Sequence, residues 1–156
     1  AYAAKVAGWV QGYTSNPNNS FADWSFMQRK VADFSAAADG FQARVDATAA
    51  ALGAGYPNIA RLRSAGVSGP RLRAMNDVLV GLERVFLGGH AETESYFFKH
   101  VLYTPSAVNS YGSTVMPLIA DHLAGRNATT ATFDIGRISQ YIGRAARFVN
   151  TSVWWA

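Results

Sequence analysis

The segment Arg61–Arg73 constrains the fold more than any other part of this sequence. It places two Arg-Leu-Arg triplets on either side of a turn that contains Gly66, Gly69 and Pro70. Glycine reaches backbone dihedrals that other residues avoid, while proline fixes its own φ and disfavours the helical region for the residue before it. The pattern therefore predicts that one helix ends near Ala65 and that another begins at Pro70.

The same turn brings four arginines together, and the sequence between Asp46 and Asp77 contains no acidic residue. Guanidinium groups at one corner repel one another unless an anion lies against them. Nucleic-acid phosphate is one such anion. The alternative is a corner whose arginines are only solvated, and this segment alone favours neither interpretation.

The excess of basic residues lies in the N-terminal half of the chain. The net charge is +4, and residues 1–75 carry eight basic and four acidic residues, whereas residues 76–156 carry six of each. Such an asymmetry indicates that one half faces a polyanion and that the other faces water or protein. The candidate nucleic-acid-binding residues are therefore the eight basic residues of the first half, Lys5, Arg29, Lys30, Arg44, Arg61, Arg63, Arg71 and Arg73.

Apolar residues recur at helical spacing along most of the chain, and almost no segment alternates as a strand does. The pattern predicts one all-α domain over residues 1–156. A turn at residues 14–20 leaves the first helix as an arm, Ser20 is the expected N-cap of the next helix, and Asp39-Gly40 is expected to interrupt it. The helices are expected over residues 1–13, 21–38, 41–52, 70–87, 90–103, 106–123 (with a kink at Pro117) and 132–149.

Two of these helices carry the clearest core-facing patterns. The helix from Pro70 is expected to turn Leu72, Met75, Leu79, Leu82 and Phe86 toward the core, and the last helix Phe133, Ile138, Tyr141, Ile142, Ala145 and Phe148. On the last helix Arg137, Arg144 and Arg147 form a basic stripe, for which solvation is the favoured interpretation over a second anion site. Trp154 and Trp155 are expected to dock on a neighbouring subunit or an apolar layer, with folding back onto the chain's own core as the equal alternative.

Several kinds of chemistry lack the residues they need. There is no cysteine, and the three histidines fit no metal-ligand spacing. Phosphate-binding glycine loops and a nucleophile elbow are missing. No uncharged apolar run approaches the roughly 20 residues of a membrane span. We therefore expect a protein that is not an enzyme and that has no metal or cofactor.

A collinear series of short motifs resembles the major coat proteins of filamentous and rod-shaped archaeal viruses, of the lipothrixvirus, tristromavirus and rudivirus kind. The series consists of Gly8-Trp9, Tyr13-Thr14, Ser15-Asn16-Pro17, Phe41-Gln42, Gly66-Val-Ser-Gly-Pro70, Gly88-Gly89 and Tyr111-Gly112. Each piece is short, and the order and spacing carry the resemblance.

The resemblance implies an all-helical fold, in which an N-terminal arm and a helix-turn-helix clasp around the DNA are followed by a C-terminal helical bundle. It implies a virion protein, assembled in the host cytoplasm, that coats double-stranded DNA in the A form regardless of sequence. Subunits would pair and stack into a helical filament. One departure is that relatives from rod-shaped viruses carry several basic residues before the tryptophan, where this chain has only Lys5.

The length and the Trp154-Trp155 end of the chain favour a paralogous partner subunit over a homodimer, and an enveloped filament over a naked rod. Two alternatives stay open. One is a non-viral helical protein that compacts DNA, and the other is a helical interaction module whose arginine corner binds an acidic partner protein.

Overall fold

The computed structural model describes residues 2–55, 58–89, 99–105 and 113–150, and it confirms the all-α fold class. Helices make up about three quarters of these ranges, and the one sheet described there has two short strands. In chain order the elements are α1 (Tyr2–Thr14), η1 (Pro17–Asn19), α2 (Ser25–Leu52), α3 (Ile59–Ser64), α4 (Gly69–Gly81), η2 (Leu82–Phe86), β1 (Tyr103–Pro105), β2 (Ser113–Val115), α6 (Pro117–Ala124) and α7 (Ala128–Asn150), where η denotes a 3-10 helix.

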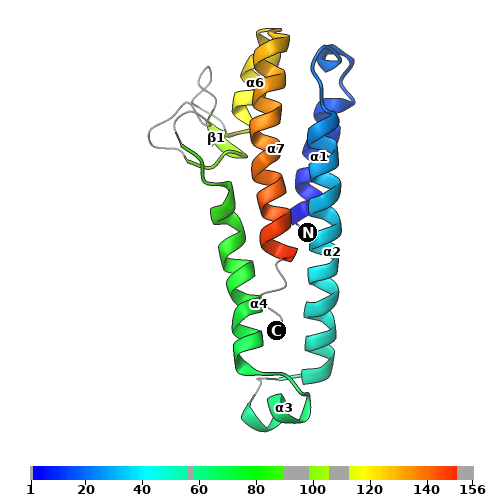
Figure 1. Cartoon of the computed structure of the whole chain (residues 1–156), viewed down its shortest axis with the longest axis vertical. Coiled ribbons are helices and arrows are strands. Elements are labelled where there is room, and N and C mark those ends of the chain that lie inside the picture. Colours follow the sequence, from blue (N-terminus) through cyan, green and yellow to red (C-terminus); the bar gives the residue numbers. More distant parts are fainter. Residues whose placement is uncertain (1, 56–57, 90–98, 106–112, 151–156) are drawn as a thin grey trace.

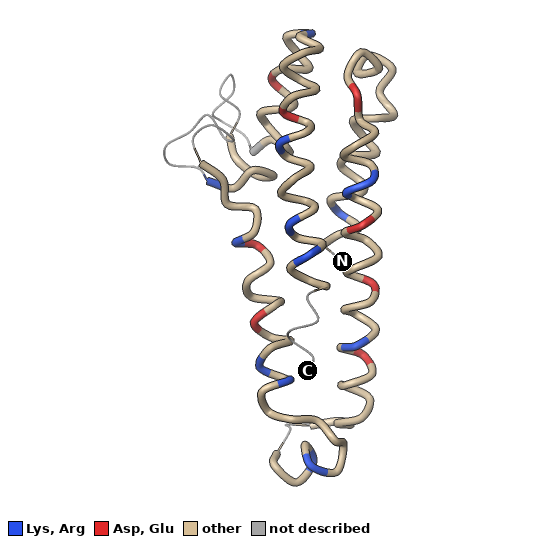
Figure 2. The backbone as a smooth tube through the Cα atoms, viewed as in Figure 1, with Lys and Arg blue, Asp and Glu red and all other residues tan. Residues whose placement is uncertain are grey.

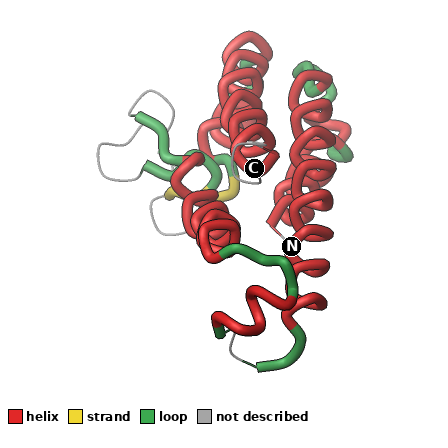
Figure 3. Tube along the Cα trace, turned by 60° about the horizontal axis from the view of Figure 1, so that its bottom comes forward, coloured by secondary structure: helices red, strands yellow, loops and turns green. Residues whose placement is uncertain are grey.

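The helices form an elongated molecule around α7 (Figure 1). Helices α1 and α2 lie on one side of α7, and α4 lies on the other. Both α2 and α4 continue beyond the last residue of α7, and α3 joins them at that far end (Figures 1 and 3). The predicted helix-turn-helix is thus a long hairpin whose turn lies away from the main core.

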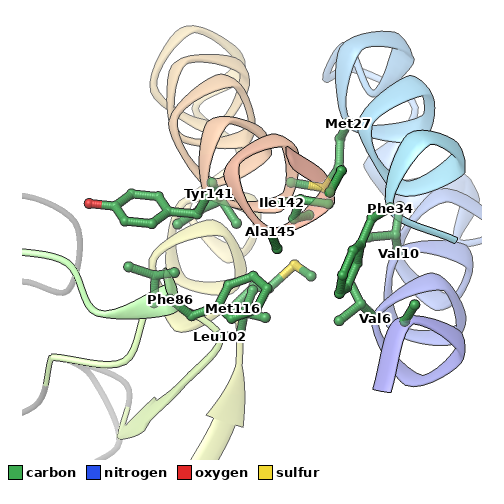
Figure 4. Packing of buried hydrophobic residues seen from close by; sticks show 14 of the residues in the cluster. Val6, Val10, Met27, Phe34, Phe86, Leu102, Met116, Tyr141, Ile142 and Ala145 are labelled. Atoms are coloured by element: carbon green, nitrogen blue, oxygen red, sulfur yellow. The ribbon is translucent and has the colours of Figure 1, made fainter. Parts of the chain in front are cut away.

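The main core lies where α7 packs on α2 and η2 and where α1 packs on α2. Met27 and Phe34 of α2 face Ile142 and Ala145 of α7 across it (Figure 4). Val6 and Val10 of α1 close one end, and Phe86, Leu102 and Met116 close the other. Because every one of these side chains is at least nine-tenths buried, this cluster is the principal source of hydrophobic stabilisation.

The first helix is packed against the bundle, so the prediction of a detached arm was wrong. Ala3, Val6 and Val10 are buried at spacings of three and four, and the Tyr13 hydroxyl donates to the carbonyl of Val115 at 2.6 Å. Burial raises the pKa of Tyr13, which keeps the phenol protonated as a donor. Three buried positions on 13 residues were enough for docking onto the core.

The break predicted at Asp39-Gly40 was also wrong, because α2 is continuous from Ser25 to Leu52. A glycine inside a helix costs about 1 kcal/mol relative to alanine. Burying a phenylalanine stabilises by about 1.5–3 kcal/mol, and Phe34 and Phe41 are both buried on this helix, one on each side of the glycine. The packing of the flanking turns therefore outweighs the local cost.

Ser20 does not cap α2. The carboxylate of Asp23 accepts the N–H of Ser25 at 2.8 Å, next to the first turn. Hydrogen bonds from the backbone and the side chain of Ser25 lower the pKa of Asp23, because they favour the charged carboxylate.

The helix predicted from Pro70 to Leu87 begins one residue earlier and ends at Gly81. Residues 82–86 form the 3-10 helix η2. The ring of Phe148 packs closely against Gly81, just before η2, so that a Cβ on residue 81 would lie only 2.8 Å from Cζ of Phe148. Met75 and Phe86 are buried as predicted, but Leu79 is 57% exposed. Val78, next to Leu79 on the same helix, is 1% exposed, so the buried face of α4 is offset by one residue from the predicted seam at this turn.

Of the two helices predicted over residues 90–123, the described part of the chain keeps only the end of the second, as α6. Residues 90–98 and 106–112 lie outside the described ranges. Leu87 pairs with His100, and β1 pairs antiparallel with β2. Pro117 does not kink a helix; it occupies the first turn of α6, where its missing N–H costs nothing.

The last helix begins at Ala128, earlier than predicted, because Asn127 caps it and accepts the N–H of Thr130 at 3.1 Å. Four of the expected core residues, Ile138, Tyr141, Ile142 and Ala145, are confirmed as buried, whereas Phe133 is 63% exposed. Trp154 and Trp155 lie outside the described residues.

Candidate nucleic-acid interface

The arginine corner is formed by α3, the turn at residues 65–68 and the start of α4. The side chain of Asn58 accepts the N–H of Arg61 at 2.9 Å and caps α3. Ser68 accepts the N–H of Arg71 at 3.3 Å and caps α4. Gly66 has φ +64°, the left-handed conformation that glycine adopts without strain. The local sequence therefore sets the predicted turn, which is confirmed.

The corner occupies the end of the molecule farthest from α6 (Figures 1 and 2). Arg63 and Arg73 are exposed, and their guanidinium groups make no hydrogen bond or ion pair with any residue in the described ranges. Arg71 is half-buried, and its Nε is buried without a hydrogen-bond partner among the described residues. An unpaired buried donor carries a desolvation cost.

Arg61 plays a different part from its neighbours. Its Nη1 donates to the carbonyl of Ala54 at the end of the α2 segment, beside Gly55. Gly55 has φ +100°, and a Cβ there would lie 3.1 Å from this same nitrogen. Arg61 thus ties α3 back to the chain after α2, and its guanidinium is less available to an external phosphate than those of Arg63 and Arg73.

The remaining predicted binding residues lie away from the corner. Arg44 lies on α2 and is half-buried, with Nε and Nη2 shielded from solvent. Arg29 and Lys30 are neighbours near the start of α2. At a rise of 1.5 Å per residue, they lie about 20 Å from Arg44 along the helix axis. Lys5 is exposed on α1. The eight residues are therefore spread over α1, α2, α3 and α4 and do not form a single cluster.

Lys30 lies against α7 in a way that the sequence did not indicate. Its Nζ forms an ion pair with Asp33 at 2.9 Å, and its Cδ lies 3.0 Å from where a Cβ on Gly143 would be. Arg147 Nη1 lies 3.8 Å from the same point. Two cationic side chains thus converge over Gly143, and this meeting depends on the α2–α7 pairing, for which no local sequence signal exists.

Of the predicted basic stripe on α7, Arg144 and Arg147 are exposed, in agreement with solvation. Arg144 lies 4.9 Å above the ring of Tyr141 and Arg137 lies 5.4 Å above that of Phe133, contacts typical of cation–π pairs. Arg137 also lies 3.7 Å from the buried carboxylate of Asp134.

Two polar clusters connect elements of the bundle. His122 Nδ1 lies 2.5 Å from Oδ2 of the buried Asp134 and joins α6 to α7. His100 Nε2 lies 2.8 Å from Oε2 of Glu83, to which Tyr2 also donates. Burial and the neighbouring Glu83 raise the pKa of Tyr2, so this phenol stays protonated. In the described ranges no group of three or more His, Cys, Asp or Glu could hold a metal ion.

Comparison with known families identifies the group to which the sequence is related. The family described as the transferrin receptor-like dimerisation domain matches residues 22–150, which run from just before α2 to the end of α7. The chain belongs to this family. The family is described as a dimerisation domain, so the match indicates that the chain binds a protein partner or associates with itself. The match leaves out α1. Among the described helices none is both long and apolar enough to cross a membrane.

Proposed function

We propose that this chain is a major coat protein of the archaeal filamentous-virus kind, which binds double-stranded DNA through phosphate contacts and self-associates into a helical filament. The observation that carries the proposal is the isolated arginine corner. Arg63 and Arg73 are exposed there with no partner in the described part of the chain, and no acidic residue lies between Asp46 and Asp77 to neutralise them.

Coating a duplex of arbitrary sequence requires contacts that ignore the bases. Phosphate contacts position a protein without reading sequence, and arginine suits them because its planar fork matches two phosphate oxygens. The second half of α2 adds a surface of exposed methyl groups from Ala43, Ala47, Ala49, Ala50 and Ala51. Small side chains let a duplex approach closely, which supports a close-fitting sleeve that holds the DNA in the A form.

The charge balance supports assembly as part of the function. Duplex DNA carries about one negative charge per 1.7 Å, so a half-chain of net charge +4 offsets about two base pairs. Covering a long duplex therefore needs many subunits in contact with one another. Membership of a dimerisation-domain family supports that association. The same proposal includes a paired subunit, which is either a paralogue or a second copy of the chain. It also includes an envelope around the filament.

Negative-stain microscopy of the purified protein with two linear duplexes of unrelated sequence tests the proposal. We expect uniform filaments of one diameter on both duplexes. The filaments should disperse when the salt concentration is raised, because binding to phosphates releases counterions and therefore weakens in salt. Irregular condensates on DNA would favour the non-viral compacting protein and would contradict a coat.

A second candidate function is a helical interaction module that binds an acidic partner protein, and the family match favours it. The arginine corner would then bind carboxylates. Failure of the protein to bind either duplex at 50 mM salt, where phosphate contacts are strong, would favour this second function.

A further inference from the structure

A cleft of about 410 Å³ lies between α2 and the last turns of α7, apart from the arginine corner. Small residues form most of its walls, with Ala36 and Ala37 on α2 and Gly143 and Ala146 on α7. Helix α2 continues beyond the cleft toward the arginine corner (Figure 1). Because these walls carry no long side chains, the cleft has room for a ligand of the size of a phosphate group.

Two cationic side chains meet in this cleft. Lys30 Cε and Arg147 Nη1 each lie 3.8 Å from the position that a Cβ on Gly143 would take. Among the described residues that line the cleft, the one acid is Asp33, which pairs with Lys30, so the lining keeps a net positive charge. Asn150 adds a side-chain amide, which can donate a hydrogen bond. Ammonium and guanidinium groups in such a set form charge-assisted hydrogen bonds with phosphate oxygens.

Gly143 allows the two cations to approach each other. It lies inside α7, where a glycine costs about 1 kcal/mol relative to alanine. A Cβ at this position would lie 3.0 Å from Cδ of Lys30, which is tighter than an ordinary van der Waals contact. The aliphatic stem of Lys30 therefore packs on α7 where a side chain would otherwise stand, while 28% of the Lys30 side chain stays exposed.

A stripe of small residues runs from the cleft toward the arginine corner. Ala36, Gly40, Ala43, Ala47 and Ala50 follow one another at spacings of four, three, four and three, which places them on one face of α2. The four alanines are exposed. A duplex that lies along this face would meet the cleft near one end of the stripe and the corner near the other.

We propose that the cleft is a second phosphate site, which holds one backbone phosphate of the duplex between Lys30 and Arg147. The inference rests on the proposed function and deepens it, because it adds a DNA contact from α7, in the half of the chain that has no excess charge. The two phosphate sites and the stripe between them then define the path of the duplex along α2.

Fluorescence anisotropy with a labelled duplex, across a salt series, tests the site on the full chain and on Arg147→Ala. We expect binding to weaken about 15-fold at 50 mM monovalent salt and about 4-fold at 200 mM, because one lost phosphate contact reduces the slope of log K against log salt by about 0.9. Arg147→Lys keeps the charge and should restore most of the affinity. Since Lys30 holds the same phosphate, the double variant with Lys30→Ala should lose less than the product of the two single losses.

The matched control removes one arginine and one lysine elsewhere. Arg84 on η2 and Lys99 are exposed, and their double alanine variant should change the affinity much less. A change of opposite sign is expected at Asp33, because Asp33→Asn releases Lys30 from its ion pair. This variant should strengthen duplex binding more than Asp77→Asn does on α4.

A wild type that binds the duplex, with an Arg147→Ala variant of unchanged affinity and slope, would overturn the inference and leave the proposed function intact. Single losses that multiply in the double variant would also overturn it, since Lys30 and Arg147 would then act as separate surface charges. If the variants kept their duplex affinity but no longer formed filaments, the cleft would bind a carboxylate of a neighbouring subunit, and the inference would fail. A wild type that binds no duplex at 50 mM salt would contradict the proposed function itself.

Discussion

Replacing Arg63 and Arg73 together by alanine should weaken duplex binding about 200-fold at 50 mM monovalent salt and about 20-fold at 200 mM. The magnitudes follow from counterion release: each lost phosphate contact reduces the slope of log K against log salt by about 0.9, so two contacts reduce it by about 1.8. Both arginines are exposed, and their guanidiniums make no hydrogen bond or ion pair with the described residues, so the monomer should fold as before. Fluorescence anisotropy with a labelled duplex across a salt series measures both numbers.

The matched control removes the same charge elsewhere. Arg84 on η2 and Arg144 on α7 are also exposed, and their double alanine variant should change the slope by much less. The loss for the corner variant should also be the same on two unrelated duplex sequences, because phosphates carry no sequence information. Equal losses from both double variants would mean that overall charge, and not the corner, binds the DNA.

Replacing Phe34 by alanine should destabilise the fold by about 3–5 kcal/mol, the usual cost of truncating a buried phenylalanine. Phe34 is 1% exposed, and its ring packs edge-on against Phe86 at 6.2 Å and against Tyr2 at 6.5 Å between centroids. It thereby joins α2 to α1 and to η2. Truncation leaves a cavity among three elements, which the rigid helices α1 and α2 cannot close.

Chemical denaturation followed by circular dichroism measures this loss. Phe133→Ala is the control of the same chemistry at a 63% exposed position, and it should stay within about 0.5 kcal/mol of wild type. In a chain of this size, the loss at Phe34 lowers the melting temperature by about 6–20 °C. A loss below about 1 kcal/mol would mean that α1 and η2 do not pack on α2 as described.

The features that the sequence predicted correctly depend on local or strongly periodic signals. The all-α class, the turn before α4 and most of the buried face of α7 follow from glycine and proline placement and from helical spacing. The caps of α3 and α4, by Asn58 and Ser68, were not predicted, although they use local chemistry of the same kind. Such features need no knowledge of what packs where.

The larger errors have the opposite cause, since they depend on tertiary contacts. Helix α2 continues through Gly40 because Phe34 and Phe41 are buried on either side, and α1 is docked through Val6 and Val10. The β1–β2 pairing joins two short segments with no alternating pattern of useful length.

In the candidate site, too, local features were predictable and tertiary contacts were not. The position of the arginine corner was predictable, but two details were not. Arg61 donates to Ala54, so its guanidinium serves the corner's own structure. Lys30 and Arg147 converge over Gly143, which requires the pairing of α2 with α7. Neither contact has a counterpart in the spacing of residues along the chain.

A helical reconstruction of the filaments, by electron cryomicroscopy at side-chain resolution, tests most directly whether the corner embraces the nucleic acid. We expect the guanidiniums of Arg63 and Arg73 within about 3 Å of phosphate oxygens, the distance of a charge-assisted hydrogen bond. The exposed alanines of α2 should line the same duplex, which should be in the A form. A reconstruction in which these arginines point into solvent or contact only protein would contradict the account.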